Sequence, residues 1–169
     1  KNHNRFTVLI TVGGTDRQNI LKKILSTLIH FKDIEIIIIV GSQIDSNNFL
    51  KLKHRNLKIV KHKKNIFKFI SVSDICITSG GIVMFESLAL NKPTYVYQTF
   101  DHQKYAINKL LSTNKIVLIG RKKTFYKYKI NKIINNYLTN KKKLRYNNSG
   151  IDRKSFFRVT NIIKKIIKK

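Results

Sequence analysis

Residues 74–103 read DICITSGGIVMFESLALNKPTYVYQTFDHQ, and this stretch decides the fold. An apolar strand ends in Ser79-Gly80-Gly81, and a helical segment that carries Glu86 follows it. Pro93 then opens a second apolar strand, which ends in Asp101-His102-Gln103. Because ligands in open α/β sheets bind beyond the carboxyl ends of the strands, the two polar clusters predict a ligand site at one edge of a sheet.

The rest of the chain continues this alternation of strands and helices. The alternation predicts an α/β fold, a Rossmann-like parallel sheet of about six strands with helices on both faces. No internal repeat and no long linker divides the sequence, so we expect residues 1–169 to form a single domain. Apolar runs predict strands at residues 6–12, 34–40, 57–60, 74–78, 94–97 and 116–119, and helical spacing predicts helices at residues 20–28, 45–53, 66–70, 82–90, 103–111, 125–138 and 152–167.

The composition indicates a globular chain. Hydrophobic residues make up 42% of it, which is enough for a packed core, and the longest apolar run, residues 34–40, is shorter than the roughly 18 residues of a membrane span.

The one cysteine, Cys76, excludes an internal disulfide framework and is expected to be a buried, inert thiol, which fits a cytoplasmic location. The N-terminal residues do not resemble a signal peptide, and the abrupt start suggests a fragment or a subunit that lacks its other half.

The charge is strongly positive, with 35 lysines and arginines against 8 acids and a net charge of +27. Nucleic-acid binding is one interpretation of such a balance. However, lysine far outnumbers arginine, and the charge is spread over the whole chain instead of forming one arm or stripe. The pattern therefore favours a helper role for positive charge near an anionic substrate or an anionic membrane surface.

Two glycine turns are candidate phosphate sites. Gly13-Gly14-Thr15 follows the first strand, and Ser79-Gly80-Gly81 precedes a helix that starts near Ile82. Glycine lets backbone N–H groups approach a phosphate, and a helix N-terminus favours an anion. The alternative is that each turn is a tight connection without a ligand, in which Asp16 or Thr15 serves as the N-cap of the next helix. Two such turns in one sheet favour a diphosphate site.

Four polar side chains are candidates for further contacts. Glu86 lies among apolar residues, so a carboxylate on the buried side of that helix needs a partner, either a pair of sugar hydroxyls or a nearby lysine. Asp101 and Gln103 suit hydroxyl groups, although Asp101 also suits an N-cap, and His102 suits acid or base chemistry. The five histidines have no metal-ligand spacing, so we predict no metal and no other cofactor.

In their order and spacing, these motifs resemble the C-terminal half of family-28-type GT-B glycosyltransferases. The closest resemblance is to the UDP-sugar hydrolase of pseudaminic acid synthesis and its spore-coat-polysaccharide relatives. The motifs cover nearly the whole chain: LITVGGTD (residues 9–16), SDICITSGG (residues 73–81), Glu86, the LALNKP stretch that ends at Pro93, the D-H-Q of residues 101–103 followed by Ala106, and the tail NNSGIDRKSFFRVTNII (residues 147–163).

The resemblance implies a UDP-sugar site in one half of a GT-B fold whose N-terminal acceptor domain is absent from this chain. The glycine turns would hold the diphosphate, Glu86 the ribose hydroxyls, Gln103 the sugar, and the loop at about residues 60–66 the uracil. Residues 82–84 (IVM) replace a Ser/Thr-rich stretch of the relatives, so phosphate contacts would come from backbone N–H groups. His102 stands where the hydrolase has Asn, which leaves transfer to an acceptor or to water open.

The resemblance therefore implies the nucleotide-sugar-binding domain of a cytoplasmic glycosyltransferase or UDP-sugar hydrolase of cell-envelope polysaccharide biosynthesis. It would bind a UDP-amino sugar and stabilise the departing UDP without a metal, and it would be inactive alone if the N-terminal half is required. Two alternatives remain open. One is a non-catalytic nucleotide-sugar-binding subunit that needs a partner chain, and the other, less favoured, is a basic α/β domain that binds nucleic acid.

Overall fold

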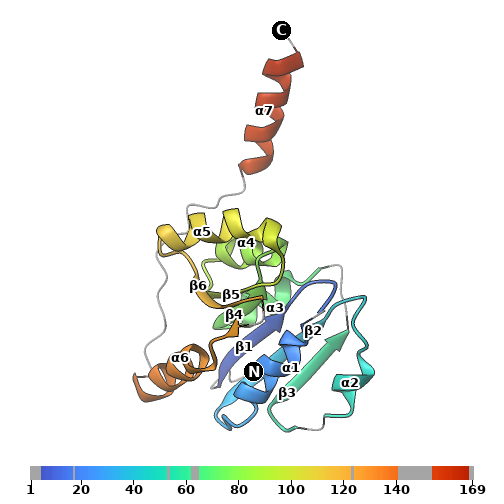
Figure 1. Cartoon of the computed structure of the whole chain (residues 1–169), viewed down its shortest axis with the longest axis vertical. Helices are drawn as coiled ribbons and strands as arrows, with labels where there is room; N and C mark the ends of the chain where they lie inside the picture. The colour runs from blue at the N-terminus through green and yellow to red at the C-terminus, as the bar shows by residue number, and fades with distance from the viewer. Residues whose placement is uncertain are drawn as a thin grey trace.

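A computed structural model gives the fold and describes residues 5–16, 18–52, 54–61, 65–122, 124–140 and 154–167. Its centre is a seven-stranded sheet in the order β3-β2-β1-β4-β5-β6-β7 (Figure 1). Neighbouring strands are parallel except β6 and β7. The strands are β1 Phe6–Thr11, β2 Ile34–Val40, β3 Leu57–Lys61, β4 Ile75–Ser79, β5 Thr94–Gln98, β6 Val117–Arg121 and β7 Thr124–Phe125.

Helices connect the parallel strands and cover both faces of the sheet, so the predicted Rossmann-like α/β fold is confirmed. The structure adds the antiparallel strand β7, and it shortens the helix predicted at residues 45–53 to α2. The first residues of the helix predicted at 152–167 lie outside the described residues. The helices are α1 Ile20–Leu28, α2 Asn47–Leu50, α3 Phe67–Val72, α4 Ile82–Ala89, the 3-10 helix η1 Asp101–Gln103, α5 Lys104–Ser112, α6 Lys127–Asn140 and α7 Ser155–Ile167.

One face of the sheet packs against α1 and α6. Val8 and Ile10 of β1 point to this face and are fully buried, and Ile134 of α6 packs in the same cluster. Helix α1 spans the residues that helical spacing predicts, and its buried residues are Ile20, Leu21, Ile24, Leu25, Thr27 and Leu28.

The opposite face packs against α3, α4 and α5. Leu9 of β1 and Cys76 of β4 lie there with Ile70 of α3, and Val96 of β5 lies there with Met84 of α4. Cys76 is 1% exposed, and burial raises the pKa of its thiol above the usual range. The thiol is therefore protonated near neutral pH, as expected for a buried, inert cysteine.

The strand order places β1 between β2 and β4, which is the point where the order of the sheet reverses. The helix that follows β1, α1, packs on one face, whereas the helix that follows β4, α4, packs on the other. The two connections therefore leave the sheet in opposite directions. In open α/β sheets this divergence opens the crevice in which ligands bind.

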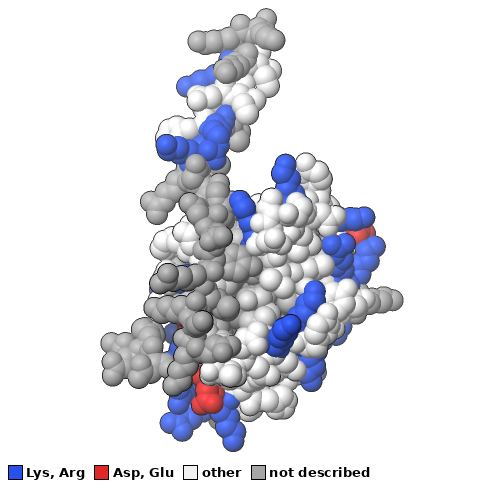
Figure 2. All heavy atoms as spheres, turned by 90° about the vertical axis from the view of Figure 1, so that its left-hand side faces the viewer, with Lys and Arg blue, Asp and Glu red and all other residues white. Residues whose placement is uncertain are grey.

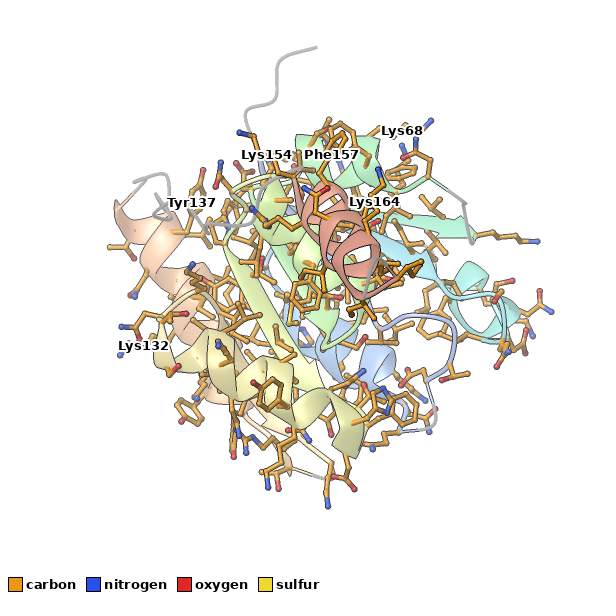
Figure 3. All side chains as sticks on the ribbon, turned by 90° about the horizontal axis from the view of Figure 1, so that it is seen from above. Lys68, Lys132, Tyr137, Lys154, Phe157 and Lys164 are labelled. Atoms are coloured by element: carbon orange, nitrogen blue, oxygen red, sulfur yellow. The ribbon has the colours of Figure 1, made fainter. Side chains whose placement is uncertain are left out.

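Positive charge is distributed around the domain. Figure 2 shows Lys and Arg scattered over one face and along α7, without a single stripe. Viewed from above, Lys68 of α3 and Lys132 of α6 lie on different sides of the domain, and Lys164 lies on α7 (Figure 3). This distribution agrees with the even spread of lysine along the sequence.

The last helix, α7, extends away from the layers of the sheet (Figure 1). Its apolar residues Ile162, Ile166 and Ile167 are more than half exposed. Among the described residues, no helix combines the length and the apolar character that crossing a membrane requires.

The loop after β1 packs directly on the end of β2, and Gly41→Ala tests this contact. A Cβ on Gly41 would lie 2.0 Å from the carbonyl oxygen of Gly13 and 2.8 Å from the carbonyl carbon of Gly14. Because these are backbone atoms, the loop has to move, and we expect the free energy of unfolding to fall by about 2–4 kcal/mol. Urea denaturation measures the change.

Gly14→Ala is the matched control for Gly41→Ala. A Cβ on Gly14 meets nothing closer than the Oγ of Ser42 at 4.0 Å. Its unfolding free energy should stay within about 0.5 kcal/mol of the wild-type value. If both variants are equally stable, the loop does not depend on glycine at position 41.

Candidate functional site

The two predicted glycine turns meet at the carboxyl edge of the sheet. A Cβ built on Gly13 would lie 3.7 Å from the Oγ of Ser79, and a Cβ built on Gly81 would lie at the same distance. Gly13 has a φ of 90°, a conformation that favours glycine. Because β1 and β4 are neighbours, the structure brings together the two turns that hold the residues predicted for phosphate contact, namely Gly13, Gly14, Thr15, Ser79, Gly80, Gly81 and Ile82.

The two glycine turns are followed by α1 and α4, and the N-termini of these helices differ in whether a side chain accepts hydrogen bonds from their N–H groups. The Asp16 carboxylate accepts hydrogen bonds from the backbone N–H groups of Ile20 at 2.7 Å and Leu21 at 2.9 Å. Asp16 thus caps α1, which confirms the N-cap alternative for Asp16, and phosphate contact at the turn of Gly13, Gly14 and Thr15 stays a prediction. By contrast, no side chain caps α4, whose N-cap residue is Gly81. The helix end at Gly81-Ile82 is therefore the one that can bind an anion.

Glu86 lies on the outside of α4. The sequence predicted a carboxylate on the buried side of this helix, but the buried residues are Met84, Ser87 and Leu88, and Glu86 is exposed. In the part of the chain that the structure describes, Glu86 forms no ion pair, so the lysine alternative has no support there. The carboxylate is accessible in the helix that begins at the glycine crevice, and ribose binding stays a prediction.

Gln103 is held inside the turn that follows β5. Its side chain is buried, and its Oε1 accepts hydrogen bonds from the backbone N–H groups of Thr99 at 2.9 Å and Phe100 at 3.2 Å. A Cβ on Gly80 would lie 3.1 Å from the Cβ of Gln103, so this turn also packs against the turn after β4. The side-chain oxygen of Gln103 is thus already hydrogen-bonded within the protein. A contact with the sugar, which stays a prediction, would come from its amide N–H groups.

Asp101 and His102 lie on the surface of the same turn. Asp101 is the first residue of η1, whereas the N-cap position belongs to Phe100, so the N-cap alternative for Asp101 is not what the structure shows. The Asp101 carboxylate pairs with the Nζ of Lys122 at 3.2 Å, and both side chains are largely exposed, so the pair contributes little stability. The exposed His102 ring stacks on Phe100, with ring centroids 5.5 Å apart.

Several buried polar atoms at this edge have no hydrogen-bond partner among the described residues. They are the Oγ1 of Thr78, the Oε1 of Gln98 and the Oγ1 of Thr99, which lie at the ends of β4 and β5. Buried polar groups in native proteins are nearly always satisfied by protein, water or a ligand. The unpaired atoms therefore mark the edge between β4 and β5 as a place for polar partners. Sequence reasoning missed them, although polar residues at the ends of apolar strands were the available signal.

Sequence reasoning also missed Gln18 in the loop between β1 and α1. The hydroxyl of Tyr97 donates a hydrogen bond to the Oε1 of Gln18 at 2.8 Å, and the Nε2 of Gln18 donates one to the backbone oxygen of Thr99 at 3.2 Å. Tyr97 is fully buried, and burial raises the pKa of its phenol, with the negative charge of Asp16 as a further cause. The end of β5 is therefore tied to the first glycine turn.

Tyr97→Phe tests the raised pKa through the pH dependence of stability. A phenol whose pKa is raised by folding stabilises the protein below its unfolded pKa of about 10, and this contribution is lost as the pH rises through the folded value. The difference in unfolding free energy between wild type and Tyr97→Phe should thus be constant up to about pH 10 and shrink above it. Urea unfolding across this range measures it.

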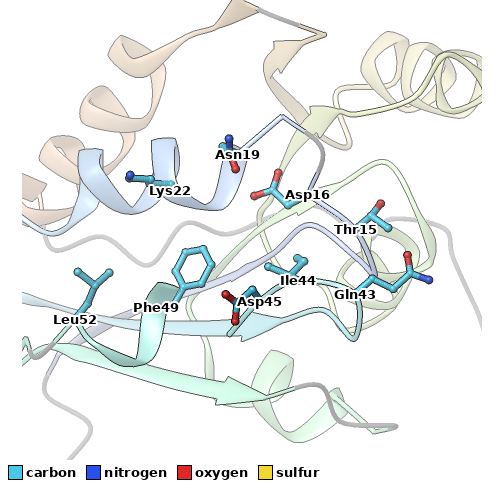
Figure 4. Close-up of a pocket in the computed structure, with 9 residues that line it drawn as sticks. All are labelled: Thr15, Asp16, Asn19, Lys22, Gln43, Ile44, Asp45, Phe49 and Leu52. Carbon is cyan, nitrogen blue, oxygen red and sulfur yellow. The ribbon is translucent and has the colours of Figure 1, made fainter. Parts of the chain in front are cut away.

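A hollow of about 710 Å³ lies beside the first glycine turn, between the loop after β1 and the loop after β2 (Figure 4). Thr15 is the one predicted site residue that lines it, so the hollow lies beside the first glycine turn and not at the turn after β4. The predicted uracil loop includes residues outside the described part of the chain. The residues that line the hollow are Thr15, Asp16, Asn19, Lys22, Gln43, Ile44, Asp45, Phe49 and Leu52.

The described side chains contain no group of three or more His, Cys, Asp or Glu residues that could hold a metal ion. The groups that the described residues place near the carboxyl edge include backbone N–H groups, the helix dipole of α4, the exposed Glu86 and the turn at residues 101–103. Such groups bind and stabilise negative charge and hydroxyl groups.

Comparison with known proteins gives one related sequence of unknown activity. No family model matches the chain. The Uncharacterized protein MJ1062 of Methanocaldococcus jannaschii is 34% identical over 103 residues, which are 57% of this chain and 21% of that protein. The chain thus spans about a fifth of this curated relative.

Solved structures share the fold at low sequence identity. MurG of Acinetobacter baumannii has a TM-score of 0.74 at 15% identity, over 98% of this chain and 51% of that chain. MnaA of S. aureus, solved with UDP, has a TM-score of 0.68 at 14% identity, over 98% and 46%. The spinosyn rhamnosyltransferase SpnG has a TM-score of 0.60 at 16% identity, over 70% and 32%. The chain therefore has the Rossmann-like α/β fold of one half of a GT-B glycosyltransferase.

Proposed function

We propose that the chain is the nucleotide-sugar-binding domain of a GT-B glycosyltransferase or UDP-sugar hydrolase and that it binds a UDP-amino sugar in the crevice between β1 and β4. The observation that carries the proposal is the uncapped N-terminus of α4 beside the two glycine turns. MnaA, which has a similar fold, was solved with UDP. This supports a uridine nucleotide as the ligand.

The diphosphate would bind at Gly81-Ile82, where the start of α4 presents backbone N–H groups that no side chain caps and the positive end of the helix dipole. When the bond between the sugar and UDP breaks, negative charge grows on the β-phosphate. Fixed N–H donors stabilise that charge without rearranging, which lowers the barrier to UDP departure. The net charge of +27 adds a positive field that attracts an anionic substrate. No metal is needed for this mechanism.

The other contacts follow from the positions of the side chains. Glu86 lies one turn into α4 and is exposed, so its carboxylate can accept two hydrogen bonds from the ribose hydroxyls. The turn at residues 101–103 lies beyond the end of β5, next to the turn after β4, where the sugar would extend from the diphosphate. In this proposal Glu86 contacts the ribose of the nucleotide, and Asp101 and Gln103 contact the sugar.

Glu86→Gln tests the ribose contact. The change keeps the shape but removes the charge that strengthens hydrogen bonds from hydroxyl groups, so UDP affinity should fall about tenfold. Because Glu86 is exposed, the unfolding free energy should change little. Isothermal titration with UDP and urea unfolding measure the two quantities.

Glu35→Gln is the matched control, since Glu35 is also exposed but lies near the start of β2, at the opposite edge of the sheet. It should leave UDP affinity unchanged. An equal loss of affinity in both variants would mean that Glu86 acts through overall charge and does not contact the ribose.

His102→Ala separates binding from chemistry in the complete enzyme. His102 is exposed beside the proposed sugar site and stacks on Phe100, where it can exchange a proton with an acceptor or water. We expect UDP affinity to stay within about twofold of wild type and turnover of UDP-sugar to fall at least about 100-fold. Unchanged turnover would remove His102 from the chemistry.

The complete activity would need the other half of a GT-B enzyme, because the acceptor and the nucleotide sugar meet between two domains. That half would be an N-terminal acceptor domain or a partner subunit, and the alternative function of a non-catalytic binding subunit fits the same crevice. Localisation at an anionic membrane surface would follow from the positive charge.

Titration of the 169-residue chain with UDP, UDP-N-acetylglucosamine and a short RNA distinguishes the classes of function. Binding of both nucleotides in the micromolar to low millimolar range supports the proposal. If neither nucleotide binds at millimolar concentration while RNA binds with a steep salt dependence, the chain is a nucleic-acid-binding domain instead.

A further inference from the structure

The two hydrogen bonds of the Gln18 side chain, which we call the Gln18 bridge, connect parts of the chain that are about 80 residues apart. Gln18 accepts from the hydroxyl of Tyr97, 79 residues away, and donates to the backbone oxygen of Thr99, 81 residues away. It uses its carbonyl oxygen and one amide hydrogen for partners on the same strand end. The bridge therefore fixes the position of Gln18 in two directions.

The partners of Gln18 are themselves held rigidly. Tyr97 is fully buried, and its ring lies so close to Gly120 of β6 that a Cβ there would be 2.6 Å from the ring. Thr99 is buried, and its N–H donates to Gln103. The bridge thus attaches the loop after β1 to a part of the sheet that cannot shift easily.

The bridge also passes over the end of β4. β4 lies between β1 and β5 in the sheet, and Ser79 pairs in register with Tyr97. A connection from the loop after β1 to the end of β5 must therefore span the strand that leads into the second glycine turn. The turns after β1, β4 and β5 are the ones that carry the candidate site residues, and the bridge sets the distance between the first and the last of them.

We propose that Gln18 is a positioning residue that holds the Gly13-Gly14-Thr15 turn and the turn at residues 101–103 at the spacing that a whole nucleotide sugar requires. The inference rests on the proposed function. UDP alone would reach the glycine turns and Glu86, whereas the attached sugar would also reach the turn after β5. Loss of the bridge should therefore weaken the binding of the nucleotide sugar, which spans both turns, more than the binding of UDP, which does not.

A purely structural role makes a different prediction. If Gln18 contributes to stability alone, its replacement lowers the free energy of unfolding. The affinities of the chain for UDP and for UDP-sugar then fall by the same factor. The ratio of the two dissociation constants distinguishes the roles, because it does not respond to a uniform loss of folded protein or of nucleotide contacts.

The test uses Gln18→Met, which keeps the length of the side chain and removes both hydrogen bonds. The dissociation constants of the 169-residue chain for UDP and UDP-N-acetylglucosamine are measured by isothermal titration. We expect the affinity for UDP to change less than about twofold and that for UDP-N-acetylglucosamine to fall about tenfold, the size that two neutral hydrogen bonds give. Asn136→Ala, at an exposed position on α6, is the control and should change neither value.

Tyr97→Phe removes one of the two bonds and should give an intermediate loss for the nucleotide sugar. Because both changes remove the same bond, the double variant Gln18→Met/Tyr97→Phe should bind no more weakly than Gln18→Met alone. Additive losses in the double variant would show that the two residues act separately, which overturns the bridge.

Hydrogen exchange gives a readout that needs no ligand. In Gln18→Met the amides of Thr99 and Phe100, which donate to Gln103, should exchange faster, whereas amides in the centre of β1 should not change. Equal loss of affinity for both nucleotides, or no change in either, overturns the positioning role while leaving the proposed function intact. A wild-type chain that binds neither nucleotide contradicts the proposed function and the inference together.

Discussion

The pairing of β1 with β4 in the centre of the sheet is the constraint on which the candidate site depends. The strands come from distant parts of the sequence, and Leu9 pairs with Cys76 and Thr11 with Thr78. Every residue of β1 is buried. A shift of its register by one residue would therefore turn each of its side chains to the other face of the sheet, and it would move the following turn by roughly 3.3 Å. The spacing of the two glycine turns is thus set by core packing below them, which explains how a site made mostly of backbone can have a defined shape.

The few acids of the chain show where negative charge is needed. Asp16 caps α1, Asp45 accepts a hydrogen bond from the N–H of Asn47, Asp74 accepts one from the N–H of Thr7, and Asp101 pairs with a lysine. Three of the described acids, Asp16, Asp45 and Asp74, therefore complete hydrogen bonding at the ends of helices and strands. Among the described residues Glu86 resembles Asp33 and Glu35 in forming no such contact, and it differs from them in lying in the helix that starts at the carboxyl edge.

The sequence sufficed for the parts of the fold that depend on local pattern. Buried parallel strands are continuous apolar runs, so β2 was predicted to the residue, whereas β7, with two residues, has no such signal. The side of α4 that carries Glu86 was misjudged because Ile82 and Phe85 are apolar yet exposed, and composition alone does not show which apolar residues face outward. Gln18 could not be found, since its partners are fixed by the tertiary structure.

The structure assigns different tasks to two turns that look alike in sequence. Both follow a strand with a glycine pair and precede a helix, but Asp16 occupies the N-terminus of α1, whereas that of α4 has no side-chain cap. A phosphate near the first turn would meet the Asp16 carboxylate, and near the second it would meet free N–H groups. Of the two helix ends, the one at α4 is therefore the one whose N–H groups no side chain caps. The turn after β1 has a close-packed backbone and, through Gln18, a link to the end of β5.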